Sequence, residues 1–252
     1  QITKSIHSAR ITQQALLPFD EQISKLFSDY FVIFRPKEIV SGDFYWIEQV
    51  EDTTFVIAAD CTGHGIPGAF MSMIGTALLD RIIMVNKIFD PAEILVHLNQ
   101  GIQKALKQKD TSNSNGMEVG VVTLKKLPKG KTRMVFAGAK NTMYYVQPGS
   151  HEVVKIKGDR QAIGGFFVRD HTFRNHEIVL EPAAQIYMGS DGLVDQNDIH
   201  RKKFSPKNLD VLLSRYACLP LSDQKTQLEK ALNKHMEGAM QRDDILWLGI
   251  KL

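Results

Sequence analysis

The sequence predicts an α+β protein in which helices flank antiparallel β-structure. The chain between Glu118 and Met188 consists largely of short β-prone runs, and turns such as Pro128-Lys129-Gly130 join several of them as in antiparallel hairpins. Helical patterns precede and follow this β-rich half. The length of 252 residues suits one large domain or two small ones with a substantial core. We expect one domain preceded by a helical arm.

The composition argues against several classes of function. The hydrophobic content of 43% and the charged content of 23% are ordinary for a soluble globular protein. The net charge of +3 is small and the basic residues are scattered, so we expect no nucleic-acid partner. We find no signal peptide and no apolar run long enough to span a bilayer, so we expect no membrane contact by this segment. Cys61 and Cys218 do not suggest a disulfide framework, which fits a cytoplasmic location.

The first expected helix covers residues 1–17. Apolar or mildly apolar residues follow one another there at alternating steps of four and three, which is heptad spacing. Two interpretations stay open: an amphipathic helix that packs on its own domain, or the end of a longer helix that forms a homodimer or carries a signal from an upstream sensor domain. Because the chain starts on Gln1 inside this pattern, we expect a fragment, with residues 1–20 as the arm and residues 21–252 as the domain. The stripe consists of Ile2, Ile6, Ala9, Gln13 and Leu16.

Pro18 ends this helix, and a loop is expected to lead to the first strand. The helix predicted near residues 67–86 is apolar on most sides and should be deeply buried, whereas the one that begins at Asp90-Pro91 has an N-cap and a proline in its first turn. Further helices are expected at about 206–217 and 221–239. Strands are predicted at residues 30–34, 39–47, 53–60, 118–124, 132–137, 143–146, 152–156, 172–179, 184–188 and 245–250.

An aspartate at the end of a buried strand organises the central stretch, residues 58–71. The apolar run Phe55–Ala59 leads to Asp60, and a glycine turn that holds His64 follows before an apolar helix begins. A buried strand that ends on an aspartate brings a charge to the edge of the core. That charge must be solvated, paired or bound to a cation.

Other aspartates occupy comparable places. Asp43 lies amid apolar residues, Asp191 follows a strand directly, and Asp243-Asp244 precedes the last strand. In an antiparallel sheet the start of one strand lies beside the end of its neighbour, so Asp60, Asp191 and Asp243 can converge. Carboxylates with few histidines and no paired cysteines favour Mg²⁺ or Mn²⁺. Two such ions about 3.5–4 Å apart can share a carboxylate and acidify a bridging water, which is the chemistry of phosphate-ester hydrolysis.

A set of six ordered motifs resembles the metal-dependent (PPM-type) serine/threonine protein phosphatases, most closely the bacterial SpoIIE-like branch. The resemblance runs from about residue 30 to the C-terminus. It implies a four-layer α-β-β-α sandwich of two antiparallel sheets flanked by helices. It also implies a two-ion Mn²⁺/Mg²⁺ centre, and a phosphorylated protein substrate of the anti-sigma-factor-antagonist type. The motifs are Val40–Tyr45, Ala59–Gly65, Phe136–Ala139, Ala162–Gly164, Ser190–Gly192 and Asp243-Asp244.

The resemblance also implies roles for individual residues. Asp60 would bridge the two metals, Asp191 and Asp243 would complete one site, and Asp43 with the backbone carbonyl of Cys61 would serve the other. Asp244 is kept as a further candidate ligand.

His64 is a candidate general acid for the leaving oxygen, or alternatively a histidine that holds the glycine turn by hydrogen bonding. Lys37 and Arg35 are candidates for the cation that grips the substrate phosphate. Lys140 and Asn141 fall in a motif region that we interpret as structural. Cys61 lacks the Cys-x₅-Arg loop of a covalent phosphatase, so we expect a small buried residue there.

Two alternative functions stay open. One is a catalytically inactive phosphatase-like scaffold that acts as a regulatory binding module, although a scaffold has no need of a carboxylate cluster. The other is a metal-dependent hydrolase of nucleotides or small phosphoesters, although no Gly-x₄-Gly-Lys-Ser/Thr loop is present.

Overall fold

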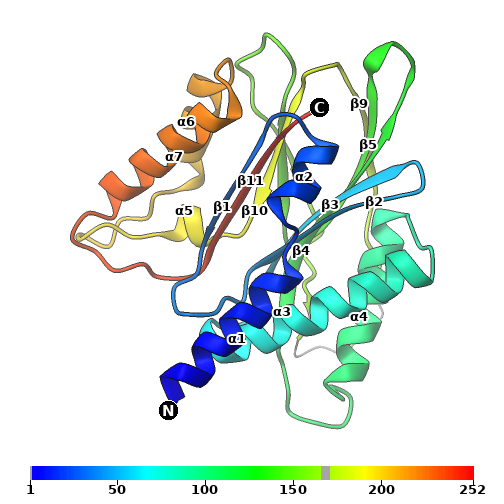
Figure 1. Cartoon of the computed structure of the whole chain (residues 1–252), viewed down its shortest axis with the longest axis vertical. Coiled ribbons are helices and arrows are strands. Elements are labelled where there is room, and N and C mark those ends of the chain that lie inside the picture. Colours follow the sequence, from blue (N-terminus) through cyan, green and yellow to red (C-terminus); the bar gives the residue numbers. More distant parts are fainter. Residues whose placement is uncertain (1, 166–170) are drawn as a thin grey trace.

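Strands that are apolar on both faces decide the architecture, because each face must be covered by another layer. In β3 (Thr53–Cys61), Phe55 and Ile57 point into one hydrophobic layer, and Val56 and Ala58 point into another. The same alternation occurs in the last strand. Two sheets therefore pack face to face, and helices cover the outer face of each (Figure 1). The expected four-layer α-β-β-α sandwich is confirmed.

The structure, a computed structural model, describes residues 2–165 and 171–252. Within this part of the chain, sheet A has the strand order β1-β11-β10-β6-β7, and sheet B has the order β2-β3-β4-β5-β9 with β8 paired to β4. All of these pairs are antiparallel. The other strands are β1 (Tyr30–Arg35), β2 (Phe44–Val50), β4 (Gly116–Lys126), β5 (Thr132–Ala139), β6 (Thr142–Val146), β7 (Val154–Lys157), β8 (Ile163–Gly164), β9 (His176–Leu180), β10 (Gln185–Gly189) and β11 (Ile245–Lys251). The helical segments are α1 (Ile2–Leu16), α2 (Asp20–Leu26), α3 (Gly65–Leu79), the π-helical η1 (Asp80–Val85), α4 (Pro91–Ala105), the short turn η2 (Pro128–Gly130), α5 (Gly192–Asp195), α6 (Pro206–Tyr216) and α7 (Leu221–His235).

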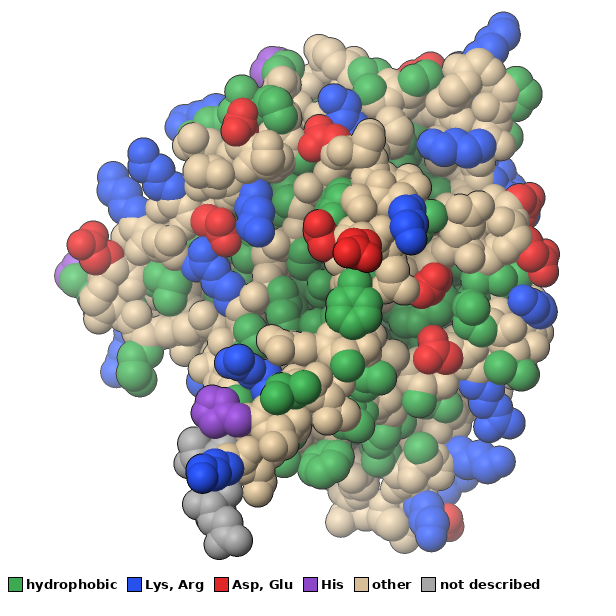
Figure 2. Space-filling view, in the orientation of Figure 1, with side chains coloured by type: hydrophobic (Ala, Val, Ile, Leu, Met, Phe, Trp, Pro, Cys, Tyr) green, Lys and Arg blue, Asp and Glu red, His purple; other side chains and the backbone are tan. Residues whose placement is uncertain are grey.

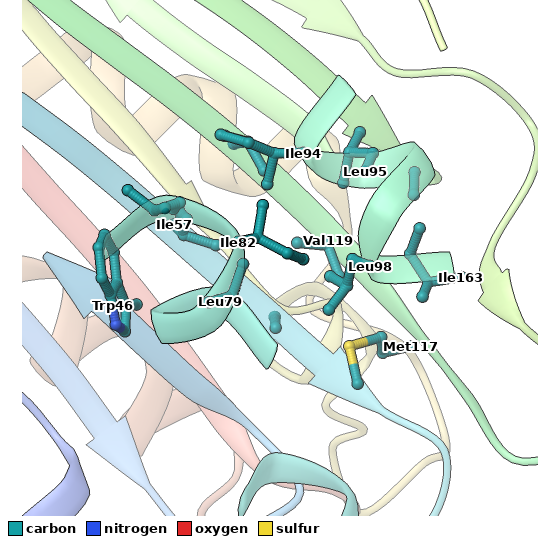
Figure 3. Close-up of a cluster of buried hydrophobic side chains, with 14 of the residues drawn as sticks. Trp46, Ile57, Leu79, Ile82, Ile94, Leu95, Leu98, Met117, Val119 and Ile163 are labelled. Carbon is teal, nitrogen blue, oxygen red and sulfur yellow. The ribbon is translucent and has the colours of Figure 1, made fainter. Parts of the chain in front are cut away.

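Three hydrophobic layers hold the sandwich together. The first lies between sheet B and the helices α3, η1 and α4, where side chains such as Ile57, Leu98 and Val119 point toward one another (Figure 3). The second lies between the two sheets and includes Ile23 of α2. The third lies between sheet A and the helices α6 and α7 and includes Trp247. On the face drawn in Figure 2, charged side chains of both signs are interspersed, without a continuous basic stripe.

Two local expectations are wrong. The loop expected after Pro18 contains α2, which begins where the Phe19 N–H donates to Gln22 Oε1 at 2.9 Å, with two acidic residues in its first turn. The strand expected at residues 39–47 begins only at Phe44, because the preceding segment bonds to side chains instead of to a neighbouring strand. The Gly42 N–H, for example, donates to Asp244 Oδ2 at 2.7 Å. The segment that leads to Asp43 is therefore an irregular loop.

The helix that runs through α3 and η1 differs from expectation in two respects. Within the helix Gly65–Val85, an 18-residue stretch has a mean hydropathy of 1.5, and the helix is long and apolar enough, by length and composition alone, to cross a membrane. The expectation that no such run exists is therefore wrong. Half of this stretch is buried inside the fold, where it packs on sheet B as a core helix does. The burial is also one-sided, since Phe70 on the outer face is 63% exposed.

We expect the Val121→Ala substitution to lower the free energy of unfolding by about 2 kcal/mol, because Val121 is fully buried between sheet B and α4 and its loss leaves a cavity. Val179→Ala is the matched control. This valine lies on the edge strand β9 of the same sheet and is 47% exposed, so its replacement should change stability by less than about 0.5 kcal/mol. Chemical denaturation of both variants measures the difference, and equal losses would contradict the layer assignment.

Candidate functional site

Carboxylates from separate segments meet at one end of the sandwich, as the antiparallel pairing requires. Asp60 and Glu118 are directly opposite each other on β3 and β4. Phe44 is opposite Ala59, so Asp43, one residue earlier, comes beside Asp60. Asp191 follows β10 and Asp243 precedes β11, and these two strands are also neighbours. The predicted convergence therefore includes Glu118, which the sequence analysis did not identify.

Two adjoining cavities lie at this end of the sandwich. One of about 270 Å³ is lined by Asp60, Asp191 and Asp243, together with residues 61–63. The other, of about 180 Å³, shares Asp60, Asp191 and Glu118 with the first. The acidic side chains therefore face open volume and are not packed entirely against protein.

The carboxyl groups disfavour one another's ionised forms. Burial raises the pKa of Asp60 to about 8, and the charges of Asp191, Glu118 and Asp243 add to the shift. Burial, followed by the charge of Asp60, raises the pKa of Asp43 well above its usual range. The pKa of Asp191 is raised by burial and by the charges of Asp195 and Asp243, against a hydrogen bond with Asp60. Carboxylates this close share protons unless a positive charge is placed among them.

The chemistry of this donor set fits a divalent cation. Like charges directly opposite on neighbouring strands are destabilising, and oxygen-only ligand sets suit Mg²⁺ and Mn²⁺. Among the described residues no ion pair neutralises these aspartates, and Asp43 and Asp244 bond to a hydroxyl and to backbone N–H groups. Within the described residues, however, no three His, Cys, Asp or Glu side chains are already positioned to hold one ion. The carboxylates would draw together around a cation.

Asp43 is tied to sheet A through Ser190. The Ser190 hydroxyl donates to Asp43 Oδ2 at 2.6 Å and accepts from the Leu246 N–H at 3.0 Å. Asp43 is only 2% exposed and does not line either cavity. Its role as a metal ligand stays a prediction, and its observed contact holds the start of β2 against β10 and β11.

Asp244 holds the loop before Asp43 in place. Its Oδ1 accepts from the Lys37 N–H and its Oδ2 accepts from the Gly42 N–H, both at 2.7 Å. Both of its oxygens are thus engaged with backbone, whereas Asp243 lines the larger cavity. The structure therefore shows different contacts for the two members of the final pair, and a ligand role for Asp244 stays a prediction.

The structure brings His64 and Lys37 together but keeps them outside the two cavities. His64 lies between Glu38, with Nδ1 to Oε1 at 2.6 Å, and Lys37, with Nε2 to Nζ at 2.9 Å. These contacts are those of a histidine that holds the turn, while its role as a general acid stays a prediction. Arg35 points elsewhere, toward α7, where it contacts Glu229 at 3.0 Å and Asn233 at 2.6 Å.

Asn141 and Cys61 are buried at the same end of the fold. Asn141 Nδ2 donates to the Gly189 carbonyl at 2.8 Å and so links the start of β6 to the end of β10, a structural contact. The Cys61 side chain is a buried free thiol, and burial raises its pKa, so it is not primed as a nucleophile. The proposed ligand of Cys61 is its backbone carbonyl, and this residue does line the larger cavity.

Sequence reasoning also missed the importance of Gln13. This glutamine is buried on α1, where its Nε2 donates to the Ser41 carbonyl at 2.6 Å and to Ser72 Oγ at 2.9 Å. Its Oε1 accepts from the Ser41 N–H at 3.0 Å. The heptad stripe contained Gln13, but the stripe gave no sign that its polar member would be the buried one. The side chain of Ile2 lies outside the described residues.

Comparisons with known proteins agree with this fold. Residues 51–252 match the profile of the family described as Stage II sporulation protein E (SpoIIE). The solved SiaA-PP2C domain of Pseudomonas aeruginosa is 32% identical with a TM-score of 0.88, over 100% of this chain and 97% of that one. A search of curated protein sequences found no match.

More distant structures share the fold. The RsbU and RsbW domains of Rv1364c from Mycobacterium tuberculosis are 19% identical with a TM-score of 0.64, over 88% of this chain and 59% of that one. RsbX, crystallised in complex with magnesium, is 12% identical with a TM-score of 0.59, over 88% of this chain and 94% of that one.

We expect the stability of the metal-free protein to fall as the pH rises from about 4 to about 8. Asp60, whose pKa is raised from 3.8 to about 8, keeps its proton over that range only in the folded state, so the folded state binds more protons there. Added Mg²⁺ or Mn²⁺ at about 100 times its Kd should raise the melting temperature at pH 8 by roughly 5–10 °C. Asp60→Asn should flatten the pH profile and remove the metal effect, whereas Asp52→Asn, on an exposed turn, should preserve both. Thermal melts with chelator or metal measure this, and a metal effect that survives in Asp60→Asn would contradict the site.

Proposed function

Because the chain belongs to the SpoIIE family of bacterial PPM-type (PP2C) serine/threonine phosphatase domains, we propose that it is an active Mn²⁺- or Mg²⁺-dependent protein phosphatase. Its reaction would be the hydrolysis of phosphoserine or phosphothreonine by water. The observation that supports catalysis most strongly is the placement of Asp60 directly opposite Glu118, with Asp60, Asp191 and Asp243 lining the same open volume. A fold with no use for a cation has no reason to keep this arrangement.

The residues of the chain have distinct tasks in this proposal. Asp60, Asp191 and Asp243 face the larger cavity and would hold the ions, together with the Cys61 carbonyl. A bound pair of divalent cations supplies Lewis acidity and a nucleophilic water at neutral pH. Ser190 and Asp244 hold Asp43 and the loop before it in place, so this end of the fold is positioned before substrate arrives. Since RsbX was crystallised with magnesium, magnesium is a suitable first ion to test.

We propose a small phosphorylated bacterial signalling protein, of the anti-sigma-factor-antagonist type, as the substrate. The similarity to a chain that carries RsbU and RsbW domains supports a place in signalling. In this proposal the chain is the cytoplasmic output domain of a longer sensor protein, with residues 1–20 as the connecting arm.

The contacts of Gln13 suggest how the arm would act on the site. Gln13 bonds to both backbone groups of Ser41, which precedes the Gly42 amide held by Asp244 and lies two residues before Asp43. Apart from this residue α1 is largely exposed, and it projects from the body of the fold (Figure 1). A change in the position of α1, through homodimerisation of residues 1–17 or through an upstream domain, would therefore reach the loop that carries Asp43.

One observation favours the alternative of an inactive scaffold: no three carboxylates among the described residues are yet arranged around an ion. Calorimetric titration with Mn²⁺ separates the two functions, because a scaffold should bind the ion poorly.

We expect phosphoester hydrolysis to require added Mn²⁺ or Mg²⁺, and Asp60→Asn and Asp191→Asn each to lower kcat/KM at least about 100-fold. Mutation of a group that hydrogen-bonds to a metal ligand typically lowers activity 10–100-fold, and mutation of the ligand itself should lower it at least as much. Asp52→Asn, on an exposed turn beside Lys125, is the control and should keep full activity. Phosphate release from a phosphoserine peptide measures the rates, and activity that persists in the presence of a chelator would contradict the metal-dependent mechanism.

We expect Gln13→Ala to lower kcat about 10-fold or more while the fold is retained. The substitution leaves the buried N–H and C=O of Ser41 without their partner, which costs about 1–3 kcal/mol of stability in the loop that leads to Asp43. Gln14→Ala, at the exposed neighbouring position, is the matched control. Hydrogen exchange of the Ser41–Asp43 amides should accelerate in the first variant only. Deletion of residues 1–17 should change both the mass in solution and the rate. An unchanged kcat in Gln13→Ala would show that the arm is merely packed on the domain.

A further inference from the structure

Among the described residues, the cation best placed to meet a substrate is neither of the two that the sequence suggested. Arg35 is bound to α7, and Lys37 contacts His64; neither lines a cavity that contains Asp60 or Asp191 in the described part of the chain. Lys140, in contrast, lines both of those cavities. It also lines a third, of about 430 Å³, that adjoins them through Glu118 and Asn141.

The fold holds Lys140 at the point where the chain passes from one sheet to the other. β5 ends in sheet B at Ala139, and β6 begins in sheet A at Thr142. Lys140 has a left-handed backbone with φ of 56°, and its N–H donates to the Asp159 carbonyl at 2.8 Å. It bridges to Val119, next to Glu118 on β4. Its backbone is thus held by both neighbouring segments, while its side chain remains half exposed.

The partner of Lys140 is easily displaced. Lys140 Nζ lies 3.7 Å from Glu118 Oε1, and the two side chains are 48% and 37% exposed. Exposed ion pairs at such distances contribute little to stability, so a more highly charged anion can replace the carboxylate. Glu118 is also held close to the aspartates by the strand register, since it faces Asp60 across the strands. Once a cation is bound among these carboxylates, Glu118 can contact that cation instead of Lys140.

Building on the proposed function, we propose that Lys140 is the substrate-binding residue that receives the phosphoryl oxygens of the phosphoserine or phosphothreonine side chain, in exchange for Glu118. A phosphate monoester dianion at the rim of the aspartate cavities is repelled by the carboxylates and needs a positive charge on the outer side. Lys140 supplies that charge at the boundary of all three cavities. Lys157 and Arg160 line the third cavity and extend the positive side away from the aspartates.

The test compares Lys140→Ala and Lys140→Arg with Lys129→Ala. Lys129 is the matched control, because it is an exposed lysine with nearly the same left-handed backbone, φ of 61°, in the turn beyond the far end of β4, roughly 25 Å of strand from Glu118. Calorimetry with inorganic phosphate in the presence of Mg²⁺ reports binding without turnover. Steady-state kinetics with a phosphoserine peptide reports KM and kcat separately.

We expect Lys140→Ala to weaken phosphate binding and to raise the KM for the phosphopeptide by about 10- to 100-fold, the loss of one charge-assisted hydrogen bond, with a smaller change in kcat. Lys140→Arg should retain most of the affinity, and Lys129→Ala should match the wild type. An unchanged Kd for phosphate in a folded Lys140→Ala protein overturns the proposal. Wild-type protein that hydrolyses nothing, but binds phosphate and loses that binding in Lys140→Ala, would instead contradict the proposed function and keep Lys140 as the phosphate-binding residue.

Discussion

Two acidic side chains face each other across neighbouring strands of sheet B, and the rest of the site follows from that constraint. Asp60 and Glu118 are opposite each other by register, and neither can move away without breaking the β3–β4 pairing that forms the centre of the sheet. Burial makes their charges more costly, as the raised pKa of Asp60 shows. A bound cation would relieve this cost, so the geometry that destabilises the metal-free fold would favour a metal-bound one.

The site is held by bonds that cross from one sheet to the other. Ser190, at the end of sheet A, donates to Asp43 at the start of sheet B, and Asp244 accepts from the loop that precedes Asp43. Because these groups are buried, leaving any of them without a partner is costly, which keeps the two sheets in one relative position at this end. The carboxylates are thus positioned by the body of the sandwich more than by flexible loops.

Two further contacts link this rigid centre to its surroundings. Gln13 brings the N-terminal helix to within two residues of Asp43, and Lys140 brings a positive charge to the boundary of the cavities. Gln13 contacts the backbone of the loop that leads to Asp43 and can transmit a change in helix position to this loop. Lys140 lies where the chain passes between the sheets and faces the solvent. Regulation and substrate binding would therefore use different sides of the same carboxylate group.

The sequence by itself determined the local elements and the kind of chemistry. Apolar runs predicted nearly all strands and longer helices, and the aspartates at their ends indicated a hard-cation site, because both signals are local in the chain. Only the tertiary structure decided which side chains meet. Glu118 is opposite Asp60 through a register set after two intervening helices, Arg35 turns to a helix nearly two hundred residues away, and Gln13 is buried where a heptad stripe suggested an apolar contact. Such pairings depend on how whole layers pack, and packing sums many distant contacts that no short stretch of sequence contains.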